Sequence, residues 1–183
     1  MRSALDESGV ALVAALMALL LLVILGTALA LLAAAETRIS ISHRAGAEAL
    51  HAADAAVELV LSEVGAISDW SGLFAGAVTS RFADGVPAGM RDTPAGAIDL
   101  TQAAHNPGWR LHAYGALRDL VRLEGVTSNA YVIVWVAPAV DSGPDALAAL
   151  AHAYTPGGLR REVQVVVRRD GDTLRRLSWH ELR

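Results

Sequence analysis

Histidine and carboxylate side chains are the groups in this sequence that could carry out chemistry, and their arrangement favours none. The chain has six histidines and no cysteine, which excludes disulfides, zinc–thiolate sites, iron–sulfur clusters and cysteine nucleophiles. No two histidines stand at the spacing of metal ligands: His43, His51, His105, His112, His152 and His180. The GxSxG, HExxH, Walker A and GxGxxG motifs are absent. We therefore predict no catalytic residue, no metal site, no cofactor and no enzymatic activity.

Two short segments place carboxylates close together, as a calcium site requires. Asp141 and Asp145 flank a Ser-Gly-Pro sequence, and Asp170 and Asp172 flank a glycine. Neither segment has the ordered ligand series of a calcium-binding loop. Turn formation is the favoured interpretation of both, and calcium binding is the alternative. The four tryptophans are expected to fill a core or its rim rather than to stack on a ligand.

The dominant element of the chain is a long apolar segment near its beginning. Residues 10–35 carry no charged side chain, and the next charged residue is Glu36. As a helix these residues would be about 39 Å long, which exceeds the ~30 Å hydrocarbon core of a bilayer. The remaining residues suffice for one small domain. The formal net charge of −4 argues against a nucleic-acid partner held by phosphate contacts.

Two familiar kinds of N-terminal segment fit this pattern in part. A cleaved signal peptide would use the small residues at 33–35 as its cleavage site, but the apolar run is much longer than the usual hydrophobic region, and Asp6 and Glu7 interrupt the basic start. A permanent single-pass anchor is the second kind. Its basic residues, Arg2 before the span against Arg38 and Arg44 after it, slightly favour the wrong orientation for an external C-terminal domain.

A third kind of segment is indicated by two sequence runs. A short hydrophilic stretch ends at Gly9, where the apolar run begins with GVAL (9–12), and an alanine-rich run, ALHAADAAVE (49–58), contains Asp54. These runs resemble the N-terminal region of PilX-type minor pilins and of type IV pilin-like pseudopilins. Later stretches are also similar to such chains: WRLHAYGAL (109–117), AYVIVWVA (130–137) and LSWHELR (177–183).

The resemblance implies a function in filament assembly. It implies a minor pilin or pseudopilin of a type IV pilus or type II secretion system, cut by a prepilin peptidase between Gly9 and Val10 and methylated on Val10. Its partners would be other pilins or pseudopilins, through the N-terminal helix, and the inner membrane, with a single span and a periplasmic C-terminal domain before entry into the filament. Two positions depart from the usual pilin pattern, because Ser8 replaces a basic residue and Ala14 replaces a glutamate. The alternative function is a single-pass envelope protein whose external domain binds a partner or ligand.

Small residues four positions apart recur within the apolar run and favour close helix–helix contact in lipid. The pairs are Ala11/Ala15, Ala14/Ala18 and Gly26/Ala30. In a chain this rich in alanine such pairs also arise by chance, so both interpretations stay open.

The fold class predicted is α+β and pilin-like, with a long N-terminal helix packed on a C-terminal antiparallel sheet. The predicted segments are a leader peptide (1–9), a transmembrane helix (10–35), its amphipathic continuation (36–64), an irregular connection with a short helix near 100–104 (65–108), and the sheet domain (109–183). A plain anchor followed by a separate helix is the alternative for 10–64.

Helical spacing predicts which side of the continuation is buried. The side expected to pack on the sheet contains Leu50, Ala53, Val57, Val60, Leu61 and Val64. The opposite side is expected to face solvent, with little effect of substitution, and contains His51, Asp54, Glu58 and Ser62.

Five strands are predicted in the C-terminal part: Trp109–Tyr114, Tyr131–Val136, Leu147–Tyr154, Glu162–Arg168 and Leu174–Trp179. The Pro-Gly and Asp-Gly turns at 155–158 and 169–172 make the last three an antiparallel meander. A short helix is the alternative for the alanine-rich third segment. In the fourth, the alternation of Val163, Val165 and Val167 with their neighbours predicts one face packed on the helix.

Overall fold

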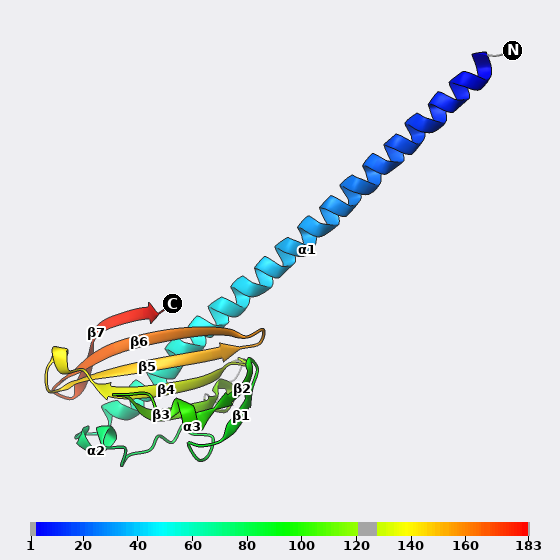
Figure 1. The fold of residues 1–183 in the computed structure, drawn as a ribbon. Helices are drawn as coiled ribbons and strands as arrows, with labels where there is room; N and C mark the ends of the chain where they lie inside the picture. Colours follow the sequence, from blue (N-terminus) through cyan, green and yellow to red (C-terminus); the bar gives the residue numbers. More distant parts are fainter. Residues whose placement is uncertain (1–2, 121–127, 183) are drawn as a thin grey trace. The chain divides into compact units, whose positions relative to one another are not determined.

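The computed structural model describes residues 3–120 and 128–182 (Figure 1). It divides into two compact units, Met1–His43 and Arg44–Arg183. The helix α1 (Ser3–Gly65) supplies the described part of the first unit and the beginning of the second. All other elements belong to the second unit, and each unit is described by itself.

The first unit is helical because its residues are strong helix formers with no proline among them. Every residue from Gly9 to His43 is exposed, although most of these residues are apolar. In the described part of the chain, α1 is the one helix long and apolar enough to cross a membrane, with a mean hydropathy of 2.9 in its most apolar window. The described residues therefore contain one candidate membrane span, near the N-terminus.

The second unit is built on a five-stranded antiparallel sheet in the order β3-β4-β5-β6-β7. The strands are β3 (Arg110–Ala116), β4 (Tyr131–Pro138), β5 (Ala146–Thr155), β6 (Leu159–Asp170) and β7 (Thr173–Leu182). Each strand pairs with the next one in the chain, so the sheet is a simple meander. This confirms the antiparallel sheet and all five strands expected from the sequence.

Two glycine turns set the register of the last three strands. Gly157 and Gly158, with φ of 90° and 77°, close the turn between β5 and β6, and Gly171, with φ of 61°, closes the next one. The alanine-rich segment is the strand β5, so the helical alternative for it was wrong. Six consecutive residues at its start are buried, because both faces of this central strand are covered.

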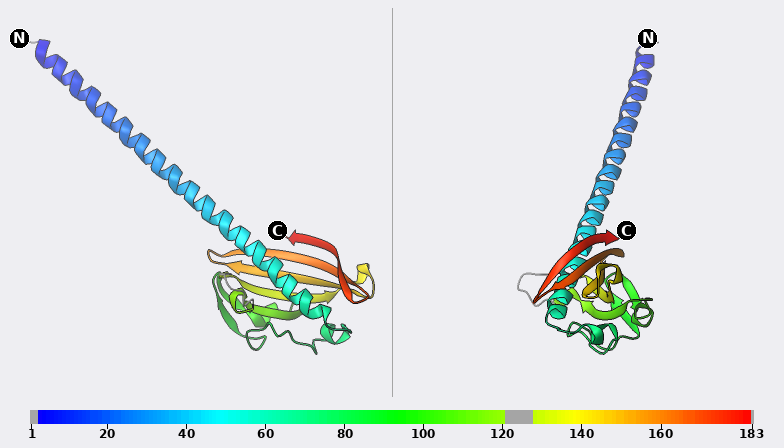
Figure 2. Two further views of the ribbon diagram at one scale, coloured as in Figure 1. Left: turned by 180° about the vertical axis from the view of Figure 1, so that it is seen from behind. Right: turned by 90° about the vertical axis from the view of Figure 1, so that its left-hand side faces the viewer.

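The last part of α1 lies across one face of the sheet (Figure 2). Its buried side contains Val57, Val60 and Val64, each with no exposed surface, and it packs against the inward-facing side chains of the strands. Val163, Val165 and Val167 supply the β6 part of this core, as their alternation predicted. Leu50 is only half-buried; the other five residues expected on this side of the helix are buried.

The opposite face of the sheet has a second core. Ile133 and Trp135 of β4 pack there with Leu100, which begins α3 (Leu100–Ala103). A two-stranded hairpin, β1 (Met90–Thr93) and β2 (Gly96–Asp99), precedes that helix. Smaller elements complete the unit: α2 (Ser71–Phe74), α4 (Leu117–Leu120) and the 3₁₀ turn η1 (Val140–Ser142).

The hairpin corrects the expectation of an irregular connection over residues 65–108, while the short helix near residue 100 is confirmed. The hairpin has a weak signal in the sequence because its strands hold one β-branched apolar residue, Ile98, and no regular alternation. Ile98 packs against the second core, on the outer face of the sheet, and this contact positions the hairpin.

Candidate functional site

The predicted processing residues lie on the exposed helix of the first unit. Gly9 and Val10 are helical and exposed, and a Cβ added at Gly9 would meet no atom within 4 Å. With Val13, Ala14 and Met17 they line a shallow depression of about 410 Å³ along the helix. The small residues at 9 and 14 leave this depression between larger neighbours, so it has the form of a hole that a side chain of another helix could fill.

The small residues predicted to mediate helix packing are all exposed in this chain: Ala11, Ala14, Ala15, Ala18, Gly26 and Ala30. The one polar group between them, the hydroxyl of Thr27, donates to the backbone oxygens of Val23 and Ile24 at 3.0 and 2.9 Å. The helix therefore satisfies its own polar side chain and leaves an apolar surface with small-residue gaps.

The buried side of α1, which contains Val57, Val60 and Val64, is called the buried strip below. In the second unit, polar contacts join α1 to β7 on one side of this strip. The Trp179 Nε1–H donates to Asp54 Oδ1 at 2.9 Å. Glu58 forms an ion pair with Arg176. Asp54 and Glu58 were expected to face solvent. Glu58 is exposed, as expected, whereas Asp54 is partly buried, and the contacts of both carboxylates with β7 were not expected. The reason is that the sheet is wider than the helix, so β7 extends beyond the buried strip and meets the side of α1 (Figure 2).

On the other side of the strip, two further carboxylates of α1 accept hydrogen bonds. Glu48 Oε1 accepts from Ser128 Oγ at 3.1 Å and from the backbone N–H of Asn129 at 3.2 Å. Glu63 accepts from Ser80 Oγ at 2.6 Å and from the backbone N–H of Arg81 at 3.0 Å. The amphipathic part of α1 is thus held by apolar packing below and by carboxylates along both sides.

His112 lies beside Glu63 and is the most buried histidine described. Its Nε2 is 3.2 Å from Glu63 Oε2, and 1% of its side chain is exposed. The two groups are close enough for a hydrogen bond but are not aligned for one, and Nε2 has no other partner. Burial lowers the pKa of His112, and the Glu63 carboxylate opposes this only in part.

A second His–Glu pair lies on the outer face of the sheet. His152 Nε2 is 3.4 Å from Glu162 Oε2, and Glu162 also pairs with Arg160 at 2.5 Å. The imidazole stands edge-on to Trp135, with 4.5 Å between ring centroids. Burial lowers the pKa of His152 to about 4. The Glu162 carboxylate raises this pKa, but by less than burial and the Arg160 guanidinium together lower it.

The first pair does not have the geometry of a serine triad. In a serine triad the histidine lies between the nucleophile and the carboxylate. Here Ser80 donates directly to Glu63, and the carboxylate lies between the hydroxyl and His112. Within residues 9–120 and 128–182, no three His, Asp or Glu side chains gather closely enough to hold a metal ion.

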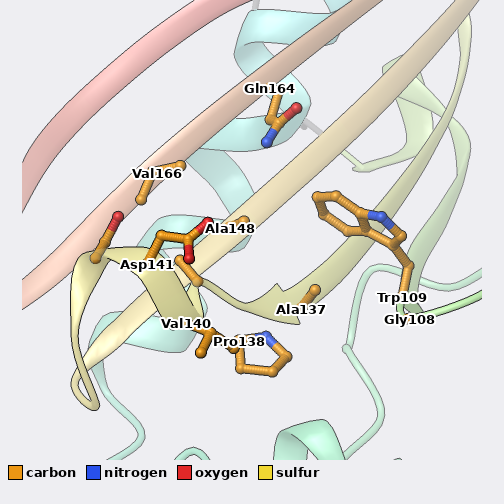
Figure 3. A pocket seen from close by; sticks show the side chains of 11 residues that line it. Gly108, Trp109, Ala137, Pro138, Val140, Asp141, Ala148, Gln164 and Val166 are labelled. Atoms are coloured by element: carbon orange, nitrogen blue, oxygen red, sulfur yellow. The ribbon is translucent and has the colours of Figure 1, made fainter.

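A groove of about 360 Å³ crosses the outer face of the sheet (Figure 3). Small side chains, Ala137 and Ala148, form part of its lining, and Trp109 forms one wall. Asp141, one of the carboxylates considered for calcium, lies at its rim and is exposed.

No protein-family model, curated protein or solved structure matches this chain. The geometry of the two units therefore carries the functional argument. The carboxylate contacts of α1 were missed because their partners lie far away in the sequence; Asp54 and Trp179, for example, are 125 residues apart. The one signal in the sequence was the repeated carboxylate along the predicted helix, at Glu48, Glu58 and Glu63.

Proposed function

We propose that this chain is a minor pilin or pseudopilin that joins or primes a filament of the type IV pilus or type II secretion kind. One observation carries the proposal. A single helix has a predominantly apolar, exposed first part and a last part whose buried side packs in the core of an antiparallel sheet domain. This division of one helix suits a subunit that is stored in a membrane and then packed beside other helices.

The first part of the helix has no partner of its own among the described residues. Leu22 and Leu31 are 70% and 72% exposed, and Val10 is 69% exposed. Burying such side chains gains about 1.5–3 kcal/mol each, so the segment is stable in lipid or against other helices rather than in water. Its small-residue gaps support helix contact, and its length supports a membrane span.

The second unit supports the proposal because its core is closed by its own residues. One face of the sheet is covered by α1, and the outer face of β3 to β5 is covered in part by the β1–β2 hairpin and α3. A subunit with such a domain can exchange lipid for neighbouring helices along its apolar segment without unfolding the domain. The strand β7, most of whose residues are exposed, then remains for contacts with neighbouring subunits.

Processing provides the decisive experiment. The full chain is coexpressed with a prepilin peptidase, and the intact mass of the product is measured. We expect loss of residues 1–9 and one added methyl group on Val10. A catalytically inactive peptidase is the control for processing by the host, and Gly9→Leu is the matched variant, expected to block cleavage because the cut requires a small residue.

Each alternative predicts a different mass. A product that keeps residues 1–9 in the presence of active peptidase contradicts the proposal and favours the permanent anchor with an external binding domain. Cleavage near Ala35 favours a secreted domain. The three outcomes differ by the mass of whole segments, so one measurement separates them.

Ala14 bears on the position of the subunit in the filament. A carboxylate inside an apolar span costs about 2.5–3.5 kcal/mol on insertion scales. In pilins that carry one, pairing with the terminal amine of an adjacent subunit is thought to offset this cost. A subunit at the tip has no subunit above it to supply that amine, so Ala14 suits a tip or initiating subunit.

The number of copies tests this placement. We expect roughly one copy per filament, located at one end, by immunolabelling or quantitative mass spectrometry of purified filaments. A subunit that is merely incorporated inefficiently would instead be scattered along the shaft. Abundance comparable to the major subunit would contradict the placement and leave the processing result unaffected.

A further inference from the structure

One edge of the sheet is covered by a short segment of irregular chain. The Tyr114 N–H of β3 donates to the Phe82 carbonyl at 3.0 Å, and the Asp84 N–H donates to the Tyr114 carbonyl at 3.0 Å. Ala83 forms a parallel bridge with Tyr114 between these two bonds. The covering segment, residues 80–84, thus occupies the edge of β3 with two backbone hydrogen bonds.

Glu63 holds the covering segment in place from the end of α1. One carboxylate oxygen accepts from Ser80 Oγ and the other from the Arg81 N–H. Ser80 Oγ in turn accepts from the Phe82 N–H at 3.0 Å, and only 6% of the serine is exposed. Loss of the Glu63 carboxylate would therefore remove two of the contacts that fix the start of the segment.

The backbone directs His112 toward this carboxylate. The pairing of β3 with β4 shifts register between Leu111 and Ala113, so His112 is the extra residue of a β-bulge. Bulges change the direction in which a side chain points, and here the imidazole is buried next to Glu63. Both oxygens of that carboxylate are already engaged by the covering segment.

Few other charges act on His112. Val134 of β4, which pairs with the neighbouring Ala113, is fully buried and apolar. The Arg81 guanidinium lies 4.7 Å from the centre of the Phe82 ring, and Arg110 of the same strand donates to the backbone of Phe74. A proton on His112 must therefore be stabilised by Glu63 or by water.

We propose that Glu63, His112 and the covering segment form a pH-operated latch: protonation of His112 draws Glu63 away from Ser80 and Arg81, or opens the site to water, and so uncovers the edge of β3. The proposal concerns the second unit alone and does not depend on the proposed filament function. An uncovered strand edge exposes backbone donors and acceptors that pair readily with another strand.

The direction of the pH effect follows from burial. The closed latch disfavours the charged imidazole, so His112 takes up a proton more readily when the latch is open. The closed state is therefore fully stabilised above the ordinary histidine pKa of about 6.5 and loses stability as the pH falls below it. The window therefore lies below neutral pH.

Hydrogen exchange of the full chain in detergent micelles tests the latch. Protection of the Asp84 and Tyr114 amides, corrected for the intrinsic pH dependence of exchange, is compared at about pH 7.5 and about pH 5.5. We expect a several-fold loss of protection at the lower pH. The variant His112→Gln, which cannot become charged, should show equal protection at both values.

His152→Gln is the matched control, because it removes a partly buried histidine from the opposite face of the sheet and should leave the loss of protection at Asp84 and Tyr114 intact. Equal protection of the wild type at both pH values overturns the proposal. Persistence of the loss in folded His112→Gln also overturns it.

A second variant keeps the test decisive if His112→Gln does not fold. Glu63→Gln keeps a hydrogen-bond acceptor but removes the charge that favours imidazolium, so the midpoint of the His112 titration, followed by imidazole ¹³C NMR, should move to lower pH. An unchanged midpoint would show that Glu63 does not act on His112 and would overturn the latch.

Discussion

The two parts of α1 share their alanine-rich composition but differ in what surrounds them. In the first unit the apolar side chains are exposed on every side of the helix, as at Leu22 with 70% exposure. In the second unit the apolar side chains form one strip, and Val57 and Val60 have no exposed surface. The strip finds its partner within the chain because one apolar side matches one face of a sheet.

The comparison teaches that the distribution of apolar residues around a helix decides which partner it needs. A one-sided strip is satisfied by a domain, and carboxylates then line its borders, as Glu48 and Glu63 do on one side. A helix that is apolar all round cannot be covered by a single sheet. It requires lipid or several other helices.

The largest effect is expected from a substitution in the buried strip of α1, which tests whether the two parts of the helix differ. Leu61→Ala should lower the free energy of unfolding of the second unit by about 2–5 kcal/mol, because it leaves a cavity in the core. Urea denaturation of the full chain in micelles, followed by tryptophan fluorescence, measures this, since all four tryptophans lie beyond residue 65. Leu22→Ala is the matched control and should change the same quantity by less than ~0.5 kcal/mol. Equal losses would contradict the division of the helix.

The next prediction concerns pH. Residues 10–35 hold no titratable side chain, so a change of pH acts on the second unit and not on this segment. His152 has its pKa lowered to about 4 by burial, so its contribution to stability is present above the ordinary value of 6.5 and is lost as the pH falls toward 4. The second unit should therefore unfold more easily across this window, measured by the same denaturation. His152→Gln should flatten the dependence, and an unchanged slope in that variant would contradict the assignment.

A smaller effect is expected at the border of the strip. Asp54→Ala should cost about 1 kcal/mol, because it leaves the Trp179 N–H without its acceptor. Glu58→Ala should cost less than ~0.5 kcal/mol, since its ion pair with Arg176 is about half exposed. His51→Ala, on the same exposed side of the helix, serves as the control. If Asp54→Ala lowers the free energy of unfolding no more than His51→Ala does, the contact with Trp179 adds no stability. The expectation from the sequence, that substitutions on this side have little effect, would then hold.

The smallest effect concerns a glycine in each part of the helix. Alanine at Gly46 gains about 1 kcal/mol of helix propensity, but its Cβ would lie 3.3 Å from Arg161 Nη2. The arginine end is flexible and partly exposed, so we expect a net stabilisation of about 0.5 kcal/mol. Gly26→Ala, where nothing lies within 4 Å, should leave the unfolding of the second unit unchanged. A destabilised Gly46→Ala would show that the Arg161–Glu181 pair depends on the glycine.

Local patterns in the sequence predicted most of the elements. The helix, the five strands and their glycine turns follow from hydrophobic periodicity and turn chemistry, both of which act over a few residues. The hairpin at 90–99 was missed because its strands lack that periodicity, and packing on the outer core determines it instead. The burial of Val163, Val165 and Val167 was predictable because alternation in a strand fixes which side chains share a face.

The sequence by itself determined that one helix has an apolar first part and a one-sided second part, because side-chain direction in a helix follows from residue number alone. Only the tertiary structure decided which polar groups meet. Trp179 reaches Asp54 because β7 lies at the sheet edge, and His112 reaches Glu63 because a bulge in β3 shifts the strand by one residue. Strand order and register bring together residues far apart in the chain, and no local pattern encodes a one-residue shift.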